Sequence, residues 1–357
     1  MKLCSVEDAK VSGKRVLVRV DLDVPLKNGN VVNNRRIRAA LPTIEFLHQR
    51  GAAVITLLAH VGRPGGKVVE SLRLAPIEKH LRELTEVPFE LRENLRFDPR
   101  EETNDPQFAK ELAALGDVFV NDAFAVSHRK HASIIGIAQL LPSYAGLNLL
   151  QEVEHLSQAL EPPRPALALI GGVKFETKEP LLEKLLSTYD RVLIGGALGN
   201  DLLKARGLPV GASLVAGVIA PTRLAGEERL EPPLDLMVAE EGKPRTASTG
   251  DVRAEEKIVD IGKGTIKMWS EEIGRAQFVL WNGPMGVYEE GYTQGTDAIA
   301  EAIVSAPCRA VIGGGDTIAA IQKLSFDTER VFLSTGGGAM LQFLVDGTLP
   351  GVEVLCK

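Results

Sequence analysis

Short apolar runs rich in β-branched residues recur along the whole chain, and most of them lead into a segment with helical spacing. Runs of this length are typical of strands that are buried on both faces of a sheet. Their alternation with helical segments predicts parallel strands joined by crossover helices, and hence an α/β architecture. The predicted strands are Val16–Val20, Ala53–Leu58, Val118–Val120, Ala166–Ile170, Val192–Ile194, Phe278–Trp281, Ala310–Ile312 and Val331–Leu333.

Two segments illustrate the helices that would cover such sheets. In residues 41–49 the apolar side chains recur on one helical face, and Pro42 is expected in the first turn. Residues 104–115 open on Asn-Asp-Pro, a helix-starting sequence. Both are predicted to pack against a sheet.

A proline cluster at residues 161–165 marks the candidate domain boundary. Consecutive prolines cannot continue the helical stretch from about residue 147 to 160, which would therefore connect two domains. A length of 357 residues allows two or three domains. Two segments rich in Pro, Gly and Glu, 226–233 and 240–250, are predicted to be surface loops rather than a third domain.

The composition excludes several classes of protein. With 45% hydrophobic and 25% charged residues, the chain matches an ordinary globular protein. Its net charge of −6 has the wrong sign for coating a nucleic acid. Three cysteines without paired spacing indicate neither a disulfide framework nor a Cys-rich metal site, and the first residues lack the apolar run of a signal peptide. We therefore expect a cytoplasmic protein with no membrane or nucleic-acid partner.

Basic residues of the N-terminal half lie near predicted strand ends or helix starts. The carboxyl ends of parallel strands meet in one crevice, so these side chains could converge on a multiply charged anion. Taken singly, each arginine could equally be a solvated surface residue. The set is Arg36, His60, Arg63, Arg96 and Arg129.

The C-terminal half instead carries glycines after its predicted strands, at 171–172, 195–196, 313–315 and 336–338. Glycine lets backbone N–H groups approach phosphate oxygens, although one such cluster is more often a tight turn. Lys174 and Lys178 could both point toward a polyphosphate, or could be exposed lysines at a helix start. Asp316 could hold magnesium, or could simply be an N-cap.

Several common signatures are missing from the sequence. It contains no G-x-x-x-x-G-K-[ST], no G-x-G-x-x-G, no G-x-S-x-G and no H-E-x-x-H. This argues against P-loop enzymes, classical dinucleotide dehydrogenases, serine hydrolases and zincins.

Short stretches of this sequence resemble those of phosphoglycerate kinases, and they occur in the family's order from one end of the chain to the other. They are Arg19 to Pro25, Arg36-Ile37, Ala39 to Ile44, His60 to Pro64, Glu93 to Phe97, Asn121 to Phe124, His128-Arg129, Gly171 to Lys174, Trp281 to Glu289, Gly313 to Thr317 and Ser334 to Gly338. The resemblance implies two doubly wound, Rossmann-like parallel-sheet domains facing each other across a hinged cleft. It assigns residues 1–146 to a 3-phosphoglycerate domain, on which 346–357 pack, 147–162 to the interdomain helix, and 163–345 to a nucleotide domain.

The same resemblance implies the roles of particular residues. Arg36 and Lys174 would flank the transferred phosphoryl group, and Gly336, Gly337 and Gly338 would donate N–H groups to it. The expected 3-phosphoglycerate ligands are Asp21, Asp23, Arg36, His60, Val61, Gly62, Arg63, Arg96 and Arg129. The expected nucleotide ligands are Lys178, Asn282, Pro284, Glu289, Gly314, Gly315, Asp316 and Thr317, with Asp316 also holding Mg²⁺.

The implied reaction is reversible, Mg²⁺-dependent phosphoryl transfer from 1,3-bisphosphoglycerate to ADP, giving 3-phosphoglycerate and ATP in a monomeric enzyme. Two alternatives remain at this point: a catalytically idle family member that binds nucleotide or a partner, and a kinase acting on another carboxylate. A dehydrogenase is disfavoured by the missing dinucleotide fingerprint.

The sequence also departs from the family pattern. Asp23 stands where relatives usually have Asn, which adds a carboxylate beside an anionic substrate and would require a neighbouring cation such as Arg38. The chain is shortened around residues 84–94 and 213–235, and residues 195–200 replace a more glycine-rich string.

Overall fold

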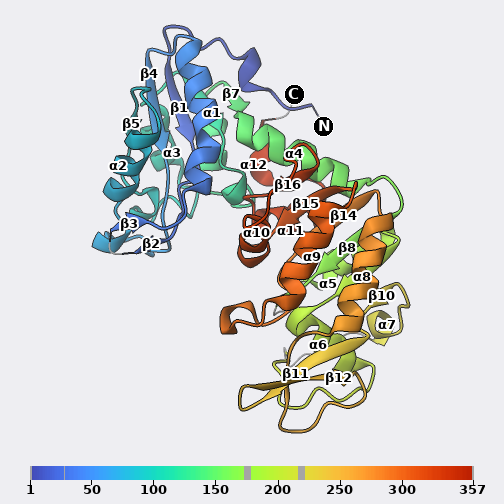
Figure 1. The fold of residues 1–357 in the computed structure, drawn as a ribbon. Coiled ribbons are helices and arrows are strands. Elements are labelled where there is room, and N and C mark those ends of the chain that lie inside the picture. The colour runs from blue at the N-terminus through green and yellow to red at the C-terminus, as the bar shows by residue number, and fades with distance from the viewer. Residues whose placement is uncertain (1, 28, 173–177, 216–221, 356–357) are drawn as a thin grey trace. The chain divides into compact units, whose positions relative to one another are not determined.

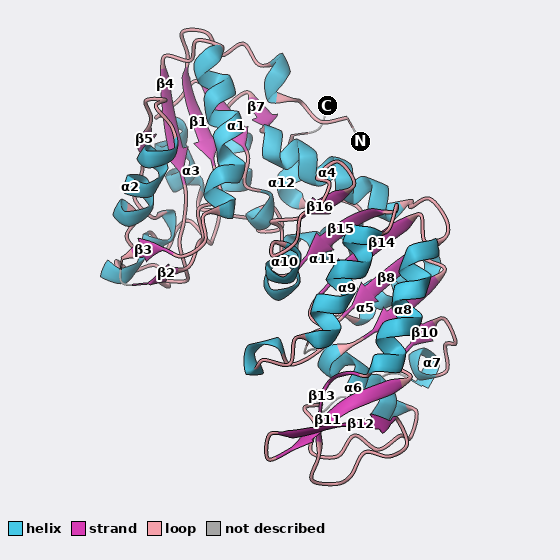
Figure 2. Ribbon diagram, viewed as in Figure 1, coloured by secondary structure: helices cyan, strands magenta, loops and turns pink. Residues whose placement is uncertain are grey.

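The computed structural model describes residues 2–27, 29–172, 178–215 and 222–355. The described chain forms two compact units, here called unit 1 (residues 1–154 with 338–357) and unit 2 (residues 155–337) (Figure 1). In both units helices flank the strands (Figure 2). No helix of the described ranges is long and apolar enough to cross a membrane.

Unit 1 is built on a five-stranded sheet in which all neighbours are parallel, in the order β5-β4-β1-β6-β7. The strands are β1 (Arg15–Arg19), β4 (Val54–Leu58), β5 (Glu90–Leu91), β6 (Val118–Asn121) and β7 (Ser143–Ala145). The helices are α1 (Arg35–Gln49), α2 (Ala75–Leu84) and α3 (Pro106–Ala113), and a small hairpin joins β2 (Leu26–Lys27) to β3 (Asn30–Val31).

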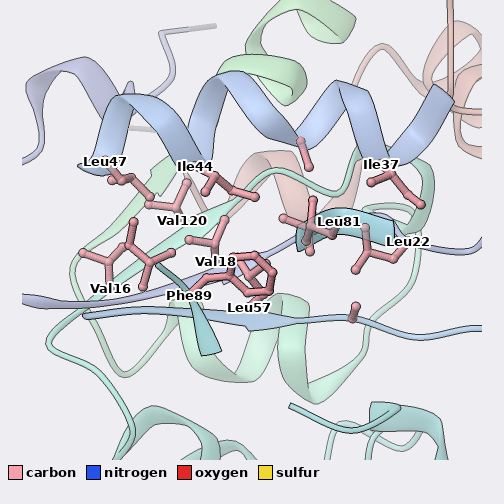
Figure 3. Packing of buried hydrophobic residues seen from close by; sticks show 14 of the residues in the cluster. Val16, Val18, Leu22, Ile37, Ile44, Leu47, Leu57, Leu81, Phe89 and Val120 are labelled. Atoms are coloured by element: carbon pink, nitrogen blue, oxygen red, sulfur yellow. The ribbon is translucent and has the colours of Figure 1, made fainter. Parts of the chain in front are cut away.

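The core of unit 1 follows from the alternation of side chains along β1. Val16 and Val18 point to the face covered by α1, where Ile44 and Leu47 pack (Figure 3). Leu17 points to the opposite face and joins the α3 side of the sheet. Both faces of the strand are therefore buried, which explains its uninterrupted apolar sequence.

The C-terminal segment belongs to unit 1 and contains α11 (Gly338–Asp346) and α12 (Pro350–Glu353). The Gly351 N–H donates to Ser127 O at 2.8 Å, and the Cys4 N–H donates to Leu355 O at 2.9 Å. Two stretches at opposite ends of the sequence thus complete the same unit.

Unit 2 contains a six-stranded parallel sheet in the order β10-β9-β8-β14-β15-β16. Its strands are β8 (Ala166–Ile170), β9 (Arg191–Ile194), β10 (Leu230–Glu231), β14 (Phe278–Asn282), β15 (Arg309–Gly313) and β16 (Val331–Leu333). The helices are α5 (Glu179–Thr188), α6 (Gly196–Ala205), α7 (Thr222–Ala225), α8 (Lys263–Arg275), α9 (Gln294–Ser305) and α10 (Gly315–Ile321). Helix α4 (Leu147–Leu160) carries the chain from one unit into the next.

The strand orders confirm the predicted doubly wound fold. Numbered along each unit, both sheets run 3-2-1-4-5, and unit 2 adds strand 6 at its edge. This order reverses direction between the first and fourth strands, and ligands of such sheets bind outside the carboxyl ends at that switch point. The switch lies between β1 and β6 in unit 1 and between β8 and β14 in unit 2.

Two local predictions were wrong. Helix α1 begins at Arg35, so Pro42 lies inside the helix and not in its first turn. The apolar face that covers β1 extends back to Ile37, and the free energy gained by burying this face outweighs the loss of one backbone hydrogen bond at Pro42. The predicted loop 226–233 contains β10, and the predicted loop 240–250 contains β12 (Lys243–Ser248), which pairs with β11 (Asp235–Glu240) in an antiparallel sheet completed by β13 (Lys257–Ile261). Only Ala247 of β12 is buried, and the polar residues are exposed or half-buried, which explains why its sequence resembles a loop.

Candidate active site

A group of charged side chains lies at the switch point of unit 1. Arg36, in the first turn of α1, reaches the residues that follow β1. Its Nε lies 3.2 Å from Asp21 Oδ2, its Nη1 donates to Asp23 O at 2.9 Å, and the same Nη1 is 4.0 Å from Asp23 Oδ2. The guanidinium is thus held by two carboxylate-bearing residues, while about a third of the Arg36 side chain stays exposed.

Asp23 also contacts the loop that follows β4. Its Oδ1 accepts a hydrogen bond from the Gly62 N–H at 2.9 Å, and its Oδ2 lies 3.8 Å from His60 Nε2. The Gly62 carbonyl in turn accepts from Arg96 Nη1 at 2.9 Å. The cation that compensates Asp23 is therefore Arg36, with Arg38 exposed on the same helix.

Burial sets the protonation states of this group. It raises the pKa of Asp21 above its usual value, although the Arg36 charge opposes the change. Burial and the Arg19 charge hold the pKa of His60 well below its usual value, so its imidazole is neutral at physiological pH. The positive charge of the site therefore resides on its arginines.

The remaining expected residues of unit 1 surround this group. Val61 is buried, and its carbonyl accepts from Asn94 Nδ2 at 2.8 Å. Arg129 is exposed, and its charge helps to lower the pKa of Arg96. Arg63 is exposed as well, and no described contact joins its side chain to the group.

The glycines of unit 2 pack backbone against backbone at the other switch point. A Cβ on Gly171, which follows β8, would lie 2.1 Å from Pro284 O, and a Cβ on Gly283, which follows β14, would lie 2.6 Å from Gly171 O. Gly283 also has a φ of +95°. Only glycine permits this approach, so these residues are required by the fold of the loops, whether or not they contact a ligand.

These loops border a cavity of about 410 Å³ that lies wholly within unit 2. Its volume falls in the range of small-molecule sites. Apolar residues of α6 and of the antiparallel sheet form much of the wall, while a few polar groups interrupt it. The lining includes Gly172, Gly196, Asn200, Leu214, Leu236, Asp260, Pro284 and Glu289.

Lys178 is buried beside this cavity at the start of α5, in contrast to the alternative of an exposed lysine. Its Nζ donates to Gly171 O, and burial lowers its pKa to about 8. At pH 7 the ammonium is still charged, and it has one described oxygen partner. Such a group favours an anionic ligand.

The loop after β15 brings two carboxylates near each other. Gly314 is the N-cap of α10, so Asp316 is not an N-cap but the second residue of the helix. Burial and the charge of Glu289 raise the pKa of Asp316. Thr317 is buried and donates to Gly314 O at 2.8 Å. Oxygen ligands that repel one another are suited to a divalent cation.

The glycine string after β16 has space around it. The Ser334 hydroxyl accepts from the Gly336 N–H at 3.0 Å, and a Cβ on Gly337 or Gly338 would meet no atom within 4 Å. Lys174, the expected partner of Arg36, lies outside the described residues.

Sequence reasoning missed a buried polar cluster beneath the site of unit 1. Arg19 and Glu101 are both fully buried, and His131 is nearly so. The one local signal was the place of Arg19 at the end of an apolar strand, although Arg15 at the other end of the same strand is exposed. Glu101, 82 positions after Arg19 along the chain, had no such signal.

Comparison with known proteins agrees with this geometry. The family model described as phosphoglycerate kinase matches residues 6–92 and 89–347. The phosphoglycerate kinase of Moorella thermoacetica is 43% identical over an alignment 393 positions long that covers 100% of both chains, and that of Roseiflexus sp. (strain RS-1) is 42% identical over 389 positions, covering 98% of each. Among solved structures, phosphoglycerate kinase from Coxiella burnetii aligns with a TM-score of 0.86 at 37% identity over 100% of both chains. The enzyme from Pyrococcus horikoshii OT3 aligns with a TM-score of 0.84 at 29% identity, covering 99% of this chain and 98% of that one.

Proposed function

The chain belongs to the phosphoglycerate kinase family, and we propose that it transfers a phosphoryl group reversibly between 1,3-bisphosphoglycerate and ADP, giving 3-phosphoglycerate and ATP. The observation that carries the proposal is the pairing of this full-length match with two chemically different switch-point sites. One is an arginine and carboxylate group in unit 1, and the other is a glycine-bordered cavity in unit 2.

We assign 3-phosphoglycerate to residues 1–146, supported by the packing of the 346–357 segment, and the nucleotide to residues 163–345. Arg36 and Arg96 present guanidinium groups whose planar geometry suits carboxylate and phosphate. The neutral His60 donates one hydrogen bond. Asp21 holds the Arg36 guanidinium in place through the 3.2 Å contact, and Val61, Gly62, Arg63 and Arg129 complete this half of the site.

On the nucleotide side, the cavity of unit 2 takes the base and ribose. Lys178 neutralises phosphate charge, and the loops that carry Asn282, Pro284, Gly314, Gly315 and Thr317 shape the phosphate path. Asp316, beside Glu289, would hold the Mg²⁺ that accompanies the nucleotide, and its raised pKa supports this because a bound cation would offset its burial. When bound, the cation neutralises charge on the nucleotide phosphates.

Phosphoryl transfer needs no protein nucleophile, since positioning and charge stabilisation supply most of the catalysis. Arg36 and Lys174 would flank the group in transfer, and the N–H groups of residues 336–338 would meet its equatorial oxygens. Because the two substrates bind different units, we propose that closure about residues 147–162 accompanies turnover and excludes water. We further propose that the enzyme is a cytoplasmic monomer.

The test is the reverse reaction with ATP, Mg²⁺ and 3-phosphoglycerate, coupled through glyceraldehyde-3-phosphate dehydrogenase to the loss of NADH absorbance. Arg36→Ala and Lys174→Ala are each expected to lower kcat by roughly 10²–10³-fold, the loss typical of a transition-state donor. Arg38→Ala removes an exposed arginine of the same helix and should keep its activity. An inactive intact chain that still binds nucleotide would contradict the proposal.

A further inference from the structure

Arg19, the last residue of β1, is fully buried directly beneath the group of charged side chains at the switch point of unit 1. Its Nη1 donates to Val20 O at 2.6 Å, its Nε donates to Ser133 Oγ at 2.9 Å, and its Nη2 lies 3.0 Å from His60 Nδ1. The guanidinium is thus fixed on three sides. None of these contacts is available to a substrate, because the side chain has no exposed surface.

A buried carboxylate balances the charge of Arg19. The Ser133 hydroxyl donates to Glu101 Oε1 at 2.6 Å, and the Ser133 N–H donates to Glu101 Oε2 at 3.1 Å. Ser133 therefore bridges the guanidinium and the carboxylate, which is the type of pairing that makes a buried charge tolerable. The bridge also fixes the direction in which Arg19 Nη2 points.

The contact between Arg19 and His60 determines the tautomer of the imidazole. An arginine side chain carries donors only, so His60 Nδ1 must accept the hydrogen bond and cannot itself carry hydrogen. In the neutral ring the single hydrogen is then on Nε2. That atom is on the substrate side, 3.8 Å from Asp23 Oδ2.

The charged groups near His60 favour this neutral form, with one exception. Arg19 from β1, Arg36 from α1 and Arg96, in the turn that follows β5, repel a positive charge on the ring, whereas His131 is itself neutral and adds no charge. Asp23 is the exception, but its carboxylate also lies against Arg36 and accepts from the Gly62 N–H. Burial acts in the same direction as the arginines.

We propose that Arg19 is a positioning residue that holds His60 as a neutral imidazole with its hydrogen on Nε2, so that His60 recognises the substrate by donating one directed hydrogen bond and not by positive charge. The inference rests on the proposed function for the identity of that substrate. It predicts specificity for a ligand with an oxygen acceptor at His60, either the hydroxyl or the carboxylate of the three-carbon acid. His60 then contributes direction, while the arginines contribute charge.

The first test is ¹⁵N NMR of the intact protein labelled at histidine, without substrate. We expect an unprotonated Nδ1 and a protonated Nε2 for His60, assigned by comparison with His60→Gln, unchanged between about pH 5.5 and 8. A hydrogen on Nδ1, or an imidazolium in this range, would overturn the proposal. This test uses no variant of Arg19 and does not depend on activity.

The second test removes the buried pair together. Arg19→Met leaves Glu101 unpaired and endangers folding, so Glu101→Gln accompanies it in a double variant. We expect His60 in this variant to populate both tautomers and to show a higher pKa. The KM for 3-phosphoglycerate should rise by about tenfold, as expected for one misdirected hydrogen bond of a charged ligand, with kcat changing less.

The matched control is Arg15→Met, which removes the exposed arginine at the other end of β1. It should leave the His60 signals and the KM unchanged. A folded double variant with the wild-type tautomer and the wild-type KM would refute the positioning role. If the intact chain has the expected tautomer but no kinase activity, the proposed function fails while the assignment of Arg19 stands.

Discussion

Replacing Asp23 by asparagine is expected to tighten the binding of 3-phosphoglycerate. The Asp23 carboxylate lies against Arg36, the guanidinium proposed to bind this anion. The amide oxygen of asparagine can still accept from the Gly62 N–H, now bonded to Asp23 Oδ1 at 2.9 Å. The substitution therefore removes the charge and keeps the contact that holds the loop after β4.

The size of the effect follows from the geometry. Asp23 Oδ2 is 4.0 Å from Arg36 Nη1, and the side chain is 38% exposed. Unit charges at this distance attract by about 1 kcal/mol in water and about 4 kcal/mol at an effective dielectric of 20, and the exposure places this pair near the lower value. In the wild-type protein, an incoming anion must compete with the Asp23 carboxylate for Arg36, and that carboxylate also repels the anion by a similar amount. We therefore expect Asp23→Asn to gain about 1–2 kcal/mol, or roughly 5- to 30-fold in KM.

Initial rates of the coupled reverse reaction, measured at several salt concentrations, supply the assay. The gain should be greatest at low salt, because screening weakens both terms. Asp21→Asn is the matched comparison with the opposite sign: Asp21 is buried and holds Arg36 Nε at 3.2 Å, so its loss should raise KM. An unchanged or higher KM for Asp23→Asn would refute the reasoning, since it would mean that Arg36 already neutralises the carboxylate completely.

Four further substitutions test other parts of the structure. Lys178 loses its charge above pH about 8, so the KM for ATP should rise through that pH, and Lys178→Met should abolish the dependence in steady-state assays. Gly171→Ala, whose Cβ would meet Pro284 O at 2.1 Å, should unfold unit 2 in thermal denaturation, whereas Gly274→Ala, with open space inside α8, should stabilise it by about 0.4–1 kcal/mol. Burial raises the pKa of Asp122 to about 7, so its contribution to the free energy of unfolding is present at low pH and is lost as pH rises through 7. Asp122→Asn should flatten the dependence of denaturant midpoints on pH between about 4 and 7.

The fold could be predicted because its strands are buried on both faces. Such strands leave a local signal, since nearly every position must be apolar, and the crossover helices between them leave a periodic one. Strand β12 of the antiparallel sheet gave no such signal, because only Ala247 is buried and a proline lies near its start, so its sequence resembles a loop. Pro42 led to a helix start that was predicted too late in the sequence. The preference of proline for the first turn takes no account of the packing against the sheet that extends α1 back to Arg35.

The candidate site was predictable to the extent that its residues lie at strand ends. The switch point of the unit 1 sheet brings Asp21, Arg36 and His60 together, as the pattern alone indicates. What each side chain does there depends on contacts between distant parts of the chain. Burial and the charge of Arg19 set the charge state of His60, and Arg19 is linked through Ser133 to Glu101. No spacing in the sequence links these residues. A histidine within a basic string therefore appears from sequence to be one more cation, whereas its surroundings make it a neutral donor with one defined direction.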